Sequence, residues 1–423
     1  MLHSGWKIKK LGNLLDFKNG MNTDKSQYGS GPKFVNVMDV FNNDEIDDNK
    51  IIGRVNASEK QLSNYKIKYG DILFNRTSEV FDEIAMSAVY IDTGLVTFGG
   101  FVIRGRPITK ELNVSFCIYL FQSQDFRKQA IRMGQGAIRS NIGQKDLAKI
   151  EIKYPPLQEQ KKIAKILSTW DKAISTTQKL IDNSQQQKKA LMQQLLTGKR
   201  RFDGFDGVWC EYKLGNIGYT FNGLTGKTKK DFGQGEKFIP YVNIFNNSSV
   251  DINTLQLVNI KPNENQNLVI YGDILFTTSS ETPYEVGMSS VFLSKTKEKI
   301  YLNSFCFGFR LNSFETILPE FMQYLLRSEG VRRSIIMLAQ GATRYNLSKV
   351  QLMKIIIKIP NMKEQKKIET ALTNTDKELE TQKQQLTNLK QEKKALMQQL
   401  LTGKLRVKTD NQPQEHKKHT KIK

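Results

Sequence analysis

The chain contains one long segment twice. The twelve residues KKALMQQLLTGK occupy positions 188–199 and return at 393–404, an offset of 205 positions. Two shorter segments recur at nearly the same offset: EQKKI at 159–163 and 364–368, and YGDILF at 69–74 and 271–276. A period of about half the chain is too long for a solenoid or propeller repeat. The sequence therefore predicts one module in two copies, each a globular domain followed by a helix.

The helix of each copy is marked by its composition. Residues 159–196 and 364–401 contain neither Gly nor Pro, and Gly198 and Gly403 follow them at positions suited to a helix C-cap. The chain is long enough for two to three domains, each with a core of its own. We therefore expect a first globular domain at 1–157, a helix at 158–200, a second globular domain at 201–360, a second helix at 361–404 and a basic, disordered tail at 405–423.

Each predicted helix carries a single apolar seam with heptad spacing. Its a positions include Leu167, Ile181 and Leu195 in the first helix and Leu372, Leu386 and Leu400 in the second. Seams of this kind pair helices. Since each helix has only one seam, we expect the two helices to pair with each other as an antiparallel coiled coil, with the globular domains at opposite ends.

Polar residues interrupt both seams. Lys188 and Lys393 stand at equivalent a positions, and polar seam residues fix the register of a helix pair at a cost in stability. A helix of roughly forty residues is about 60 Å long, the length of at most about eighteen base-pair steps. The pair is therefore expected to act as a spacer between the domains.

The globular domains are expected to belong to the mixed α+β class. In each, the YGDILF segment is typical of a strand that begins at a Gly-Asp turn, and Asp71 and Asp273 are expected to serve these turns rather than catalysis. Residues 34–37 (FVNV) and 241–244 (YVNI) are expected to form equivalent short strands. More helical stretches follow, at 115–133 and 318–338.

The chain is strongly basic, with a formal net charge of +22. The charge is concentrated in the helical segments, where residues 158–202 hold 10 Lys and Arg against 3 Asp and Glu. A basic protein of this size is suited to a polyanion, because each neutralised phosphate releases counterions. The other interpretation is that the charge serves only solubility.

Nothing in the sequence indicates a self-sufficient active site. The three histidines, His3, His416 and His419, lie in the expected tails, so neither domain offers a catalytic imidazole. Gly226-Lys227-Thr228 lacks the upstream Gly of a phosphate-binding loop, and the three cysteines have no spacing that suits a metal site. No apolar run is long enough to span a membrane and no signal peptide is evident, so we expect a cytoplasmic protein.

Two loops in each domain carry side chains suited to DNA. Arg reads guanine, Asn reads adenine, and Ser and Thr contact bases or phosphates. The candidate DNA-binding residues are Arg76, Thr77, Ser78, Arg139, Ser140 and Asn141 in the first domain and Thr277, Thr278, Ser279, Arg344, Tyr345 and Asn346 in the second. For each of them the other interpretation is an exposed loop residue or a structural cap.

Taken together, these features resemble the specificity (S) subunit of type I restriction–modification systems over essentially the whole chain. The resemblance rests on the Gly-Ala-x-Arg-x-Asn loops at 136–141 and 341–346, the segment PPLQEQ at 155–160, the GDIL turns and the LLTGK segments after the helices. The second copy departs from the pattern at 360–365, where it reads PNMKEQ. This departure alters the start of the second helix but not its expected role.

The resemblance implies a division of labour. Each globular domain would be a target-recognition domain that reads one half of a split DNA sequence, and the helices would set the gap and dock two methyltransferase (modification) subunits. Restriction (translocase–nuclease) subunits would join that complex. This chain would be non-catalytic and bind no cofactor, while S-adenosylmethionine, ATP and magnesium would be used by the partners. Since the two domains differ in sequence, we expect an asymmetric bipartite target in double-stranded DNA.

Two other functions remain open at this point. One is the DNA-recognition subunit of a related single-complex restriction enzyme, which differs in its partners rather than its chemistry. The other is a coiled-coil scaffold that bridges proteins and binds DNA weakly, without sequence preference.

Overall fold

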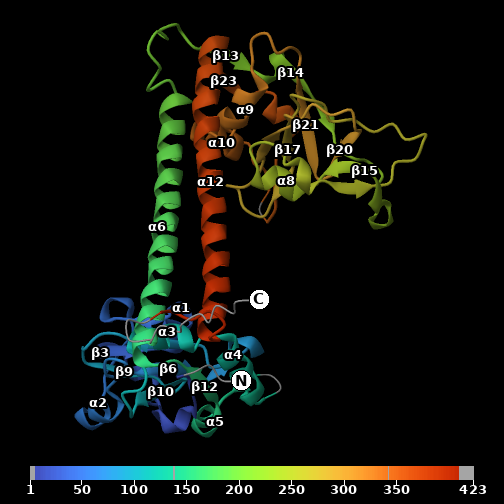
Figure 1. Ribbon diagram of the computed structural model, residues 1–423. Coiled ribbons are helices and arrows are strands. Elements are labelled where there is room, and N and C mark those ends of the chain that lie inside the picture. Colours follow the sequence, from blue (N-terminus) through green and yellow to red (C-terminus); the bar gives the residue numbers. More distant parts are fainter. Residues whose placement is uncertain (1–4, 137–138, 342, 409–423) are drawn as a thin grey trace, which may run out of the picture. The chain divides into compact units, whose positions relative to one another are not determined.

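The computed structural model describes residues 5–136, 139–341 and 343–408. The three histidines and most of the predicted tail therefore lie outside the described residues, as do positions 137, 138 and 342 of the two Gly-Ala-x-Arg-x-Asn loops. The chain forms two compact units, one made of residues 1–178 with 385–423 and the other of residues 179–384 (Figure 1). Each unit thus combines one globular domain with parts of both long helices.

The globular domain of the first unit is a mixed α+β fold. Its strands are β1 (Lys7–Lys10), β2 (Leu15–Asn19), β3 (Tyr28–Val35), β4 (Glu45–Ile46), β5 (Arg54–Val55), β6 (Ile72–Asn75), β7 (Thr77–Ser78), β8 (Ser87–Tyr90), β9 (Val96–Phe98), β10 (Val102–Pro107), β11 (Ser140–Asn141) and β12 (Glu151–Tyr154). Its α-helices are α1 (Val37–Asn42), α2 (Glu59–Tyr65), α3 (Val114–Leu120), α4 (Gln124–Met133) and α5 (Gln144–Lys149).

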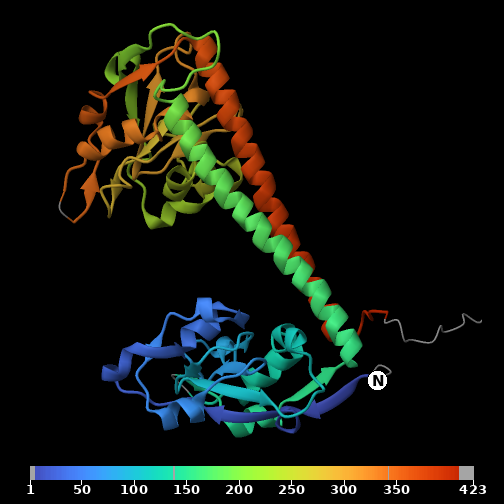
Figure 2. The same cartoon turned by 90° about the vertical axis from the view of Figure 1, so that its left-hand side faces the viewer.

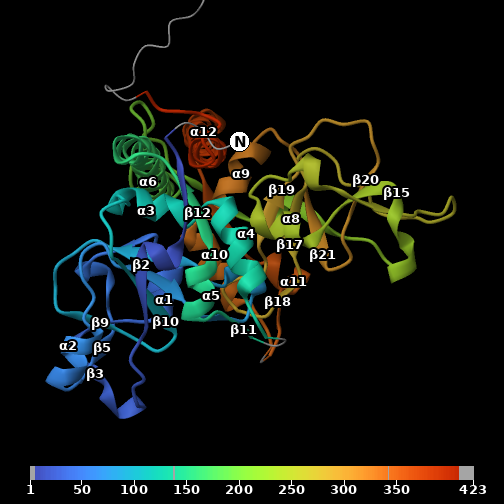
Figure 3. The same cartoon turned by 60° about the horizontal axis from the view of Figure 1, so that its bottom comes forward.

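These strands form a five-stranded sheet of order β2-β10-β6-β8-β4, a three-stranded sheet of order β5-β3-β9, and the pairs β1-β12 and β7-β11. Helix α2 lies beside the three-stranded sheet at the edge of this domain (Figure 3).

The apolar residues of the YGDILF segment in the first domain form the central strand β6, which is buried on both faces. Its side chains alternate between two faces: Ile72 and Phe74 pack in the core with α3 and α4, while Leu73 packs in a second core with β3 and β9. Every residue of β6 is buried, as expected for a strand covered on both faces. The sequence therefore places this segment correctly as a strand that begins just after Asp71.

The globular domain of the second unit repeats this architecture. Its strands are β13 (Cys210–Lys213), β14 (Gly218–Asn222), β15 (Phe232–Ile239), β16 (Gln256–Val258), β17 (Ile274–Thr277), β18 (Ser279–Ser280), β19 (Ser289–Val291), β20 (Ile300–Leu302), β21 (Cys306–Leu311), β22 (Tyr345–Asn346) and β23 (Ile356–Ile359). Its α-helices are α7 (Leu214–Ile217), α8 (Tyr241–Asn246), α9 (Pro319–Leu325), α10 (Glu329–Met337) and α11 (Lys349–Leu352). The sheets have the orders β14-β21-β17-β19 and β16-β15-β20, with the pairs β13-β23 and β18-β22.

One sequence expectation about these domains is wrong. Residues 241–244 do not form a strand equivalent to 34–37, because Tyr241 begins helix α8 directly after the strand β15. The helix α1 begins in the same way at Val37, directly after β3 and its N-cap Asn36. The correct equivalence therefore pairs Val37 with Tyr241. The expected alignment of FVNV with YVNI, which matched Phe34 with Tyr241, is therefore shifted by three residues from the structural one.

The two long helices are α6 (Leu157–Leu195) and α12 (Met362–Leu401), close to the predicted ranges. Figure 2 shows them as extended single helices. In the first unit, Ile163 and Leu167 of α6 share a core with Leu400 of α12. In the second unit, Leu195 of α6 shares a core with Ile368 and Leu372 of α12. Within each unit the early part of one helix thus packs against the late part of the other, which confirms the predicted antiparallel pairing.

Candidate nucleic-acid interface

The structure brings the two predicted DNA-binding loops of each domain together. In the first domain β7 pairs with β11, so that Thr77 lies opposite Asn141 and Ser78 opposite Ser140. In the second domain β18 pairs with β22, so that Ser279 lies opposite Asn346 and Ser280 opposite Tyr345. Loops more than sixty positions apart in the chain therefore form one continuous surface in each domain.

A third loop, which the sequence analysis did not single out, joins this surface. The backbone N–H of Arg76 donates to the carbonyl of Phe101 (2.8 Å), and the carbonyl of Arg76 accepts from Ile142 N–H (3.0 Å). Thr278 occupies the same place in the second domain: its N–H donates to the Phe305 carbonyl (3.0 Å) and its carbonyl accepts from Leu347 N–H (2.8 Å). The same hydrogen bonds therefore fix all three loops in both domains.

Most of the predicted residues present surface at this site. Those that are exposed are Arg139, Asn141, Arg344 and Asn346, and those that are half-buried are Arg76, Thr77, Thr278, Ser279 and Tyr345. Side chains that reach bases or phosphates must be accessible in the free protein or become so on binding. These nine residues meet that requirement.

Three predicted residues do not meet it. Thr277 has 0% exposed surface, and its hydroxyl accepts a hydrogen bond from Met288 N–H (3.0 Å). Ser78 is buried, with its hydroxyl donating to Glu83 (3.1 Å) and accepting from Val80 N–H (3.1 Å). Ser140 is buried as well. In this structure the hydroxyls of Thr277 and Ser78 hold their loops in place, as the structural-cap interpretation expects, while the buried Ser140 hydroxyl has no hydrogen-bond partner among the described residues.

An acidic residue adjoins the predicted arginine of the first domain. Arg139 Nη2 and Glu79 Oε1 lie 2.6 Å apart, and both side chains are largely exposed. An exposed ion pair of this kind contributes little stability, about 0–1 kcal/mol, so Arg139 is easily released to another anion. A carboxylate can also accept a hydrogen bond from the cytosine amino group. Glu79, and Glu281 at the same place after β18, are candidates that the sequence analysis passed over.

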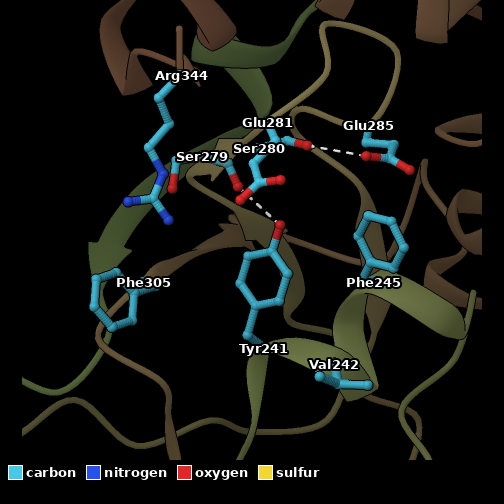
Figure 4. Close-up of a pocket in the computed structure, with 9 residues that line it drawn as sticks. All are labelled: Tyr241, Val242, Phe245, Ser279, Ser280, Glu281, Glu285, Phe305 and Arg344. Atoms are coloured by element: carbon cyan, nitrogen blue, oxygen red, sulfur yellow. Dashed lines mark hydrogen bonds between the residues drawn. The ribbon is translucent and has the colours of Figure 1, made fainter. Parts of the chain in front are cut away.

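Each domain has a hollow at this surface. In the first domain it has a volume of about 450 Å³, and its lining includes Asn22, Asn36, Arg76, Thr77, Phe101 and Asn141. In the second it has a volume of about 380 Å³ and is lined by Tyr241, Val242, Phe245, Ser279, Ser280, Glu281, Glu285, Phe305 and Arg344 (Figure 4). The two hollows thus occupy the same place and each is lined by three aromatic rings, but they differ in polar chemistry: the first has three Asn amides and one charged side chain, whereas the second has no amide and three charged side chains.

The hydroxyl of Tyr241 is a fixed feature of the second hollow. It donates to the carbonyl of Ser279 (2.8 Å; Figure 4), and burial raises the pKa of Tyr241 above its ordinary value. The phenol therefore stays neutral at physiological pH and ties α8 to β18. Val37 stands at the equivalent position of the first hollow, where no such tie is possible.

The buried aspartates before the central strands are structural, as predicted. Arg106 forms a bidentate pair with Asp71 (2.9 and 2.7 Å), and Arg310 forms the same pair with Asp273 (both 2.7 Å). Each carboxylate also accepts a backbone N–H from three residues upstream, from Lys68 and Ile270 respectively. These contacts close the turn and occupy both carboxylate oxygens.

The part of the chain that the structure describes contains no group of three His, Cys, Asp or Glu side chains that could hold a metal ion. No helix in the same residues is long and apolar enough to cross a membrane.

Comparison with known proteins agrees with this architecture. The family model described as type I restriction modification DNA specificity domain matches the chain twice, at residues 3–183 and 207–391. The MjaX type I restriction enzyme specificity subunit of Methanocaldococcus jannaschii is 26% identical over 426 residues, which cover 96% of this chain and 94% of that protein. The MjaVIII specificity subunit of the same organism is 28% identical over 309 residues, 70% of this chain and 71% of that protein.

Solved structures show the same fold. A structure reported for complex assembly and conformational transition of the type I restriction–modification system aligns with a TM-score of 0.60 at 16% identity, covering 96% of this chain and all of that chain. The family match covers most of the chain, in two copies that coincide with the internal repeat. The chain therefore belongs to the family of type I restriction–modification DNA specificity proteins.

Proposed function

We propose that this chain is the sequence-specific DNA-binding subunit of a type I restriction–modification complex, and that each globular domain reads one half of an asymmetric bipartite target. The observation that carries the proposal is the three-loop surface, which has the same backbone in both domains but different side chains. Arg76 in one domain corresponds to Thr278 in the other, and the half-buried Tyr345 takes the place of the buried Ser140. A common scaffold with different donors and acceptors is what two different half-sites require.

The nine accessible residues of the predicted set are proposed to contact DNA, with Glu79 and Glu281 added. Arg76, Arg139 and Arg344 are the residues suited to guanine, and Asn141 and Asn346 are suited to adenine. Arg139 and Arg344 recur in both copies, so they are also suited to a phosphate contact common to both domains.

The paired helices are proposed to set the gap between the half-sites and to dock two methyltransferase subunits, with restriction subunits joining the same complex. Methyl transfer from S-adenosylmethionine, and ATP- and magnesium-dependent cleavage, are assigned to those partners. This chain is proposed to act in the cytoplasm as a recognition subunit that contributes no catalytic residue. The duplicated three-loop surface and the family match favour this function over a protein-bridging scaffold.

Selection from a random pool of DNA duplexes tests this proposal. The full chain, assembled with a methyltransferase subunit of the same restriction–modification system, should enrich duplexes that share two short sequences separated by a constant number of variable positions. The methyltransferase alone provides the control. Enrichment that shows no sequence preference, from an assembled complex, would leave the scaffold as the better description.

A further inference from the structure

Two phenylalanines occupy the same position of the same turn in the two domains. The carbonyl of Gly99 accepts a hydrogen bond from Val102 N–H (2.9 Å), which makes 99–102 a β-turn with Phe101 in its third position. The carbonyl of Asn303 accepts from Cys306 N–H (3.1 Å), so that Phe305 holds the third position of an equivalent turn. The turns lead into β10 and β21 respectively.

In both turns the backbone is fixed while the ring faces outward. The carbonyls of Phe101 and Phe305 accept the hydrogen bonds from Arg76 and Thr278 described above, yet the two residues are 60% and 62% exposed. Leaving a Phe side chain in water forgoes roughly 1.5–3 kcal/mol of burial free energy. A single exposed ring is ordinary on a protein surface. A ring that recurs on the same turn of two domains with different sequences indicates that the exposed ring has the same function in both.

A second exposed apolar side chain recurs at an equivalent position of the two domains. Met38 and Val242 are the second residues of the equivalent helices α1 and α8, and both side chains are mostly exposed. Val242 lines the same hollow as Phe305. In the second domain the outward apolar surface therefore has two components, one from the helix and one from the turn, and in the first domain Met38 is exposed at the equivalent helix position.

The surroundings of the rings indicate what covers them. Phe101 lines the first hollow together with Arg76, and Phe305 lines the second together with Arg344. Figure 4 shows Phe305 and Arg344 on the same side of the hollow. An apolar ring beside a cation matches a nucleic-acid duplex, which offers base faces and methyl groups next to phosphates.

Comparison of the two domains distinguishes residues that read particular bases from residues that make a contact independent of sequence. Some polar residues at this surface differ between the domains, such as Arg76 and Thr278, as residues that specify different bases must. The Phe is retained in both, so its contact has to suit both half-sites and cannot depend on one base. Insertion of an apolar side chain between stacked bases is such a contact, and proteins that kink DNA use Phe in this way.

We propose that Phe101 and Phe305 are wedges that insert between neighbouring base pairs, one at each half-site, and locally unstack the duplex. The inference rests on the proposed function, since it requires each domain to lie against DNA. The inserted rings would then do more than help to recognise the target, because they would also prepare the duplex for methylation. A methyltransferase can reach its target base only after the base has left the stack, and a step loosened by the specificity subunit lowers the cost of that extrusion.

Fluorescence of 2-aminopurine, which rises when the base loses its stacking neighbours, tests the proposal. The probe is moved through each half-site of the cognate duplex, and the full chain is used together with its methyltransferase partner. With the wild-type chain we expect a fluorescence rise at one step in each half-site. Phe101→Ala should abolish the rise in the first half-site only, and Phe305→Ala in the second only, each with a loss of roughly tenfold in affinity. Phe101→Trp should retain the rise.

Matched controls keep the test specific. Tyr69→Ala and Ile270→Ala each remove an exposed side chain just before the central strand, at the end opposite the hollow, and should leave both signals unchanged. The recognised sequence should also stay the same in the Phe variants, because the wedge does not read bases.

The outcomes are distinguishable. Unchanged fluorescence in both Phe→Ala variants that still bind the duplex would overturn the wedge and leave the proposed function intact. Loss of methyltransferase assembly, with the DNA signal retained, would assign the rings to a protein partner and would also overturn it. If the wild-type complex shows no sequence preference for any duplex, the proposed function fails and the wedge fails with it.

Discussion

Lys393 of α12 forms an ion pair with Asp171 of α6, 222 positions away in the chain. The other oxygen of Asp171 accepts a hydrogen bond from the hydroxyl of Tyr119 on α3 (2.7 Å), and Lys393 also lies over the Tyr119 ring, 5.5 Å from its centroid. The Asp171 carboxylate of α6 thus contacts both the other long helix, α12, and the helix α3 of the globular domain. Burial raises the pKa of Tyr119, so its hydroxyl remains a donor.

The second unit repeats this cluster. Lys188 pairs with Asp376, which also accepts from the Tyr324 hydroxyl (2.8 Å), and Lys188 lies over the Tyr324 ring. The two lysines are the polar residues that interrupt the heptad seams at equivalent positions. The structure therefore gives a physical reason for them: each fixes the register of the two helices against the adjoining domain.

Removing the charge of Lys393 should destabilise the protein. Lys393→Met leaves the half-buried Asp171 carboxylate without its cation, and we expect a loss of about 1–2 kcal/mol in the free energy of unfolding, measured by urea denaturation. Lys394→Met, which removes an exposed charge next to it, is the matched control and should cost less than about 0.5 kcal/mol. Equal stability of the two variants would show that the cluster does not fix the helices.

Arg344→Ala should change recognition in one half of the target only. Loss of a bidentate base contact costs about 1–3 kcal/mol and relaxes specificity at one position, whereas loss of a phosphate contact weakens binding to every sequence alike. Binding to duplexes with each base varied in turn distinguishes these results. Thr277→Val, which alters the buried neighbour of the site, should leave the preferred sequence unchanged. A changed first half-site in the Arg344 variant would contradict the assignment of one domain to each half.

Acid should weaken the contact that holds the first strand. Glu111 accepts hydrogen bonds from Lys7 (2.9 Å) and Lys9 (2.5 Å) of β1 and from the Tyr154 hydroxyl of β12 (3.0 Å). The lysines, with Lys9 the larger cause, lower the pKa of Glu111 from 4.5 to about 2. Because the folded-state pKa is lowered, the contact stabilises the protein above pH 4.5, and this contribution is lost as the pH falls towards 2.

Glu111→Gln tests this expectation. The wild-type chain should be the more stable at pH 6, and the difference in the free energy of unfolding should narrow as the pH is lowered from about 4.5. A difference that stays constant down to pH 2 would mean that the charge of Glu111 is not what stabilises the strand pair.

Lengthening both helices should lengthen the unread gap. One heptad adds about 10 Å to a helix, or about three base-pair steps, when it is inserted in both α6 and α12 so that the seams stay matched. Both half-sites should keep their sequences, because the loops proposed to read the target are untouched. Insertion of three residues instead breaks the heptad spacing and should abolish specific binding. A gap that keeps its length after the double heptad insertion would rule out the spacer role of the helices.

The sequence predicted the architecture because the repeat and the heptads are properties of single segments. The ranges of α6 and α12 follow from Pro, Gly and apolar spacing alone, and the β6 strand follows from its own alternation. The short helix at Tyr241 was predicted wrongly, because an apolar run of four residues fits a strand and a buried helix equally well. Its assignment depends on the preceding strand β15, which fixes where the helix begins.

The site was predicted less completely. Arg139 and Arg344 were found because they recur with the repeat, but burial of Thr277 and Ser78 depends on neighbours such as Met288 and Glu83 that no local pattern reveals. Phe101 was missed because its turn has a different sequence in each copy, GGF against NSF at 303–305. Only the matching hydrogen bonds show that the two turns are equivalent.

The most direct test of the central claim is a map of methylated bases in the genome of a host. The host expresses this chain with a methyltransferase subunit of the same restriction–modification system, and a second culture expresses that methyltransferase alone. We expect methylated adenines at one split, asymmetric motif that appears only when this chain is present. An assembled and soluble complex that methylates no new motif would contradict the assignment of this chain as the subunit that chooses the target.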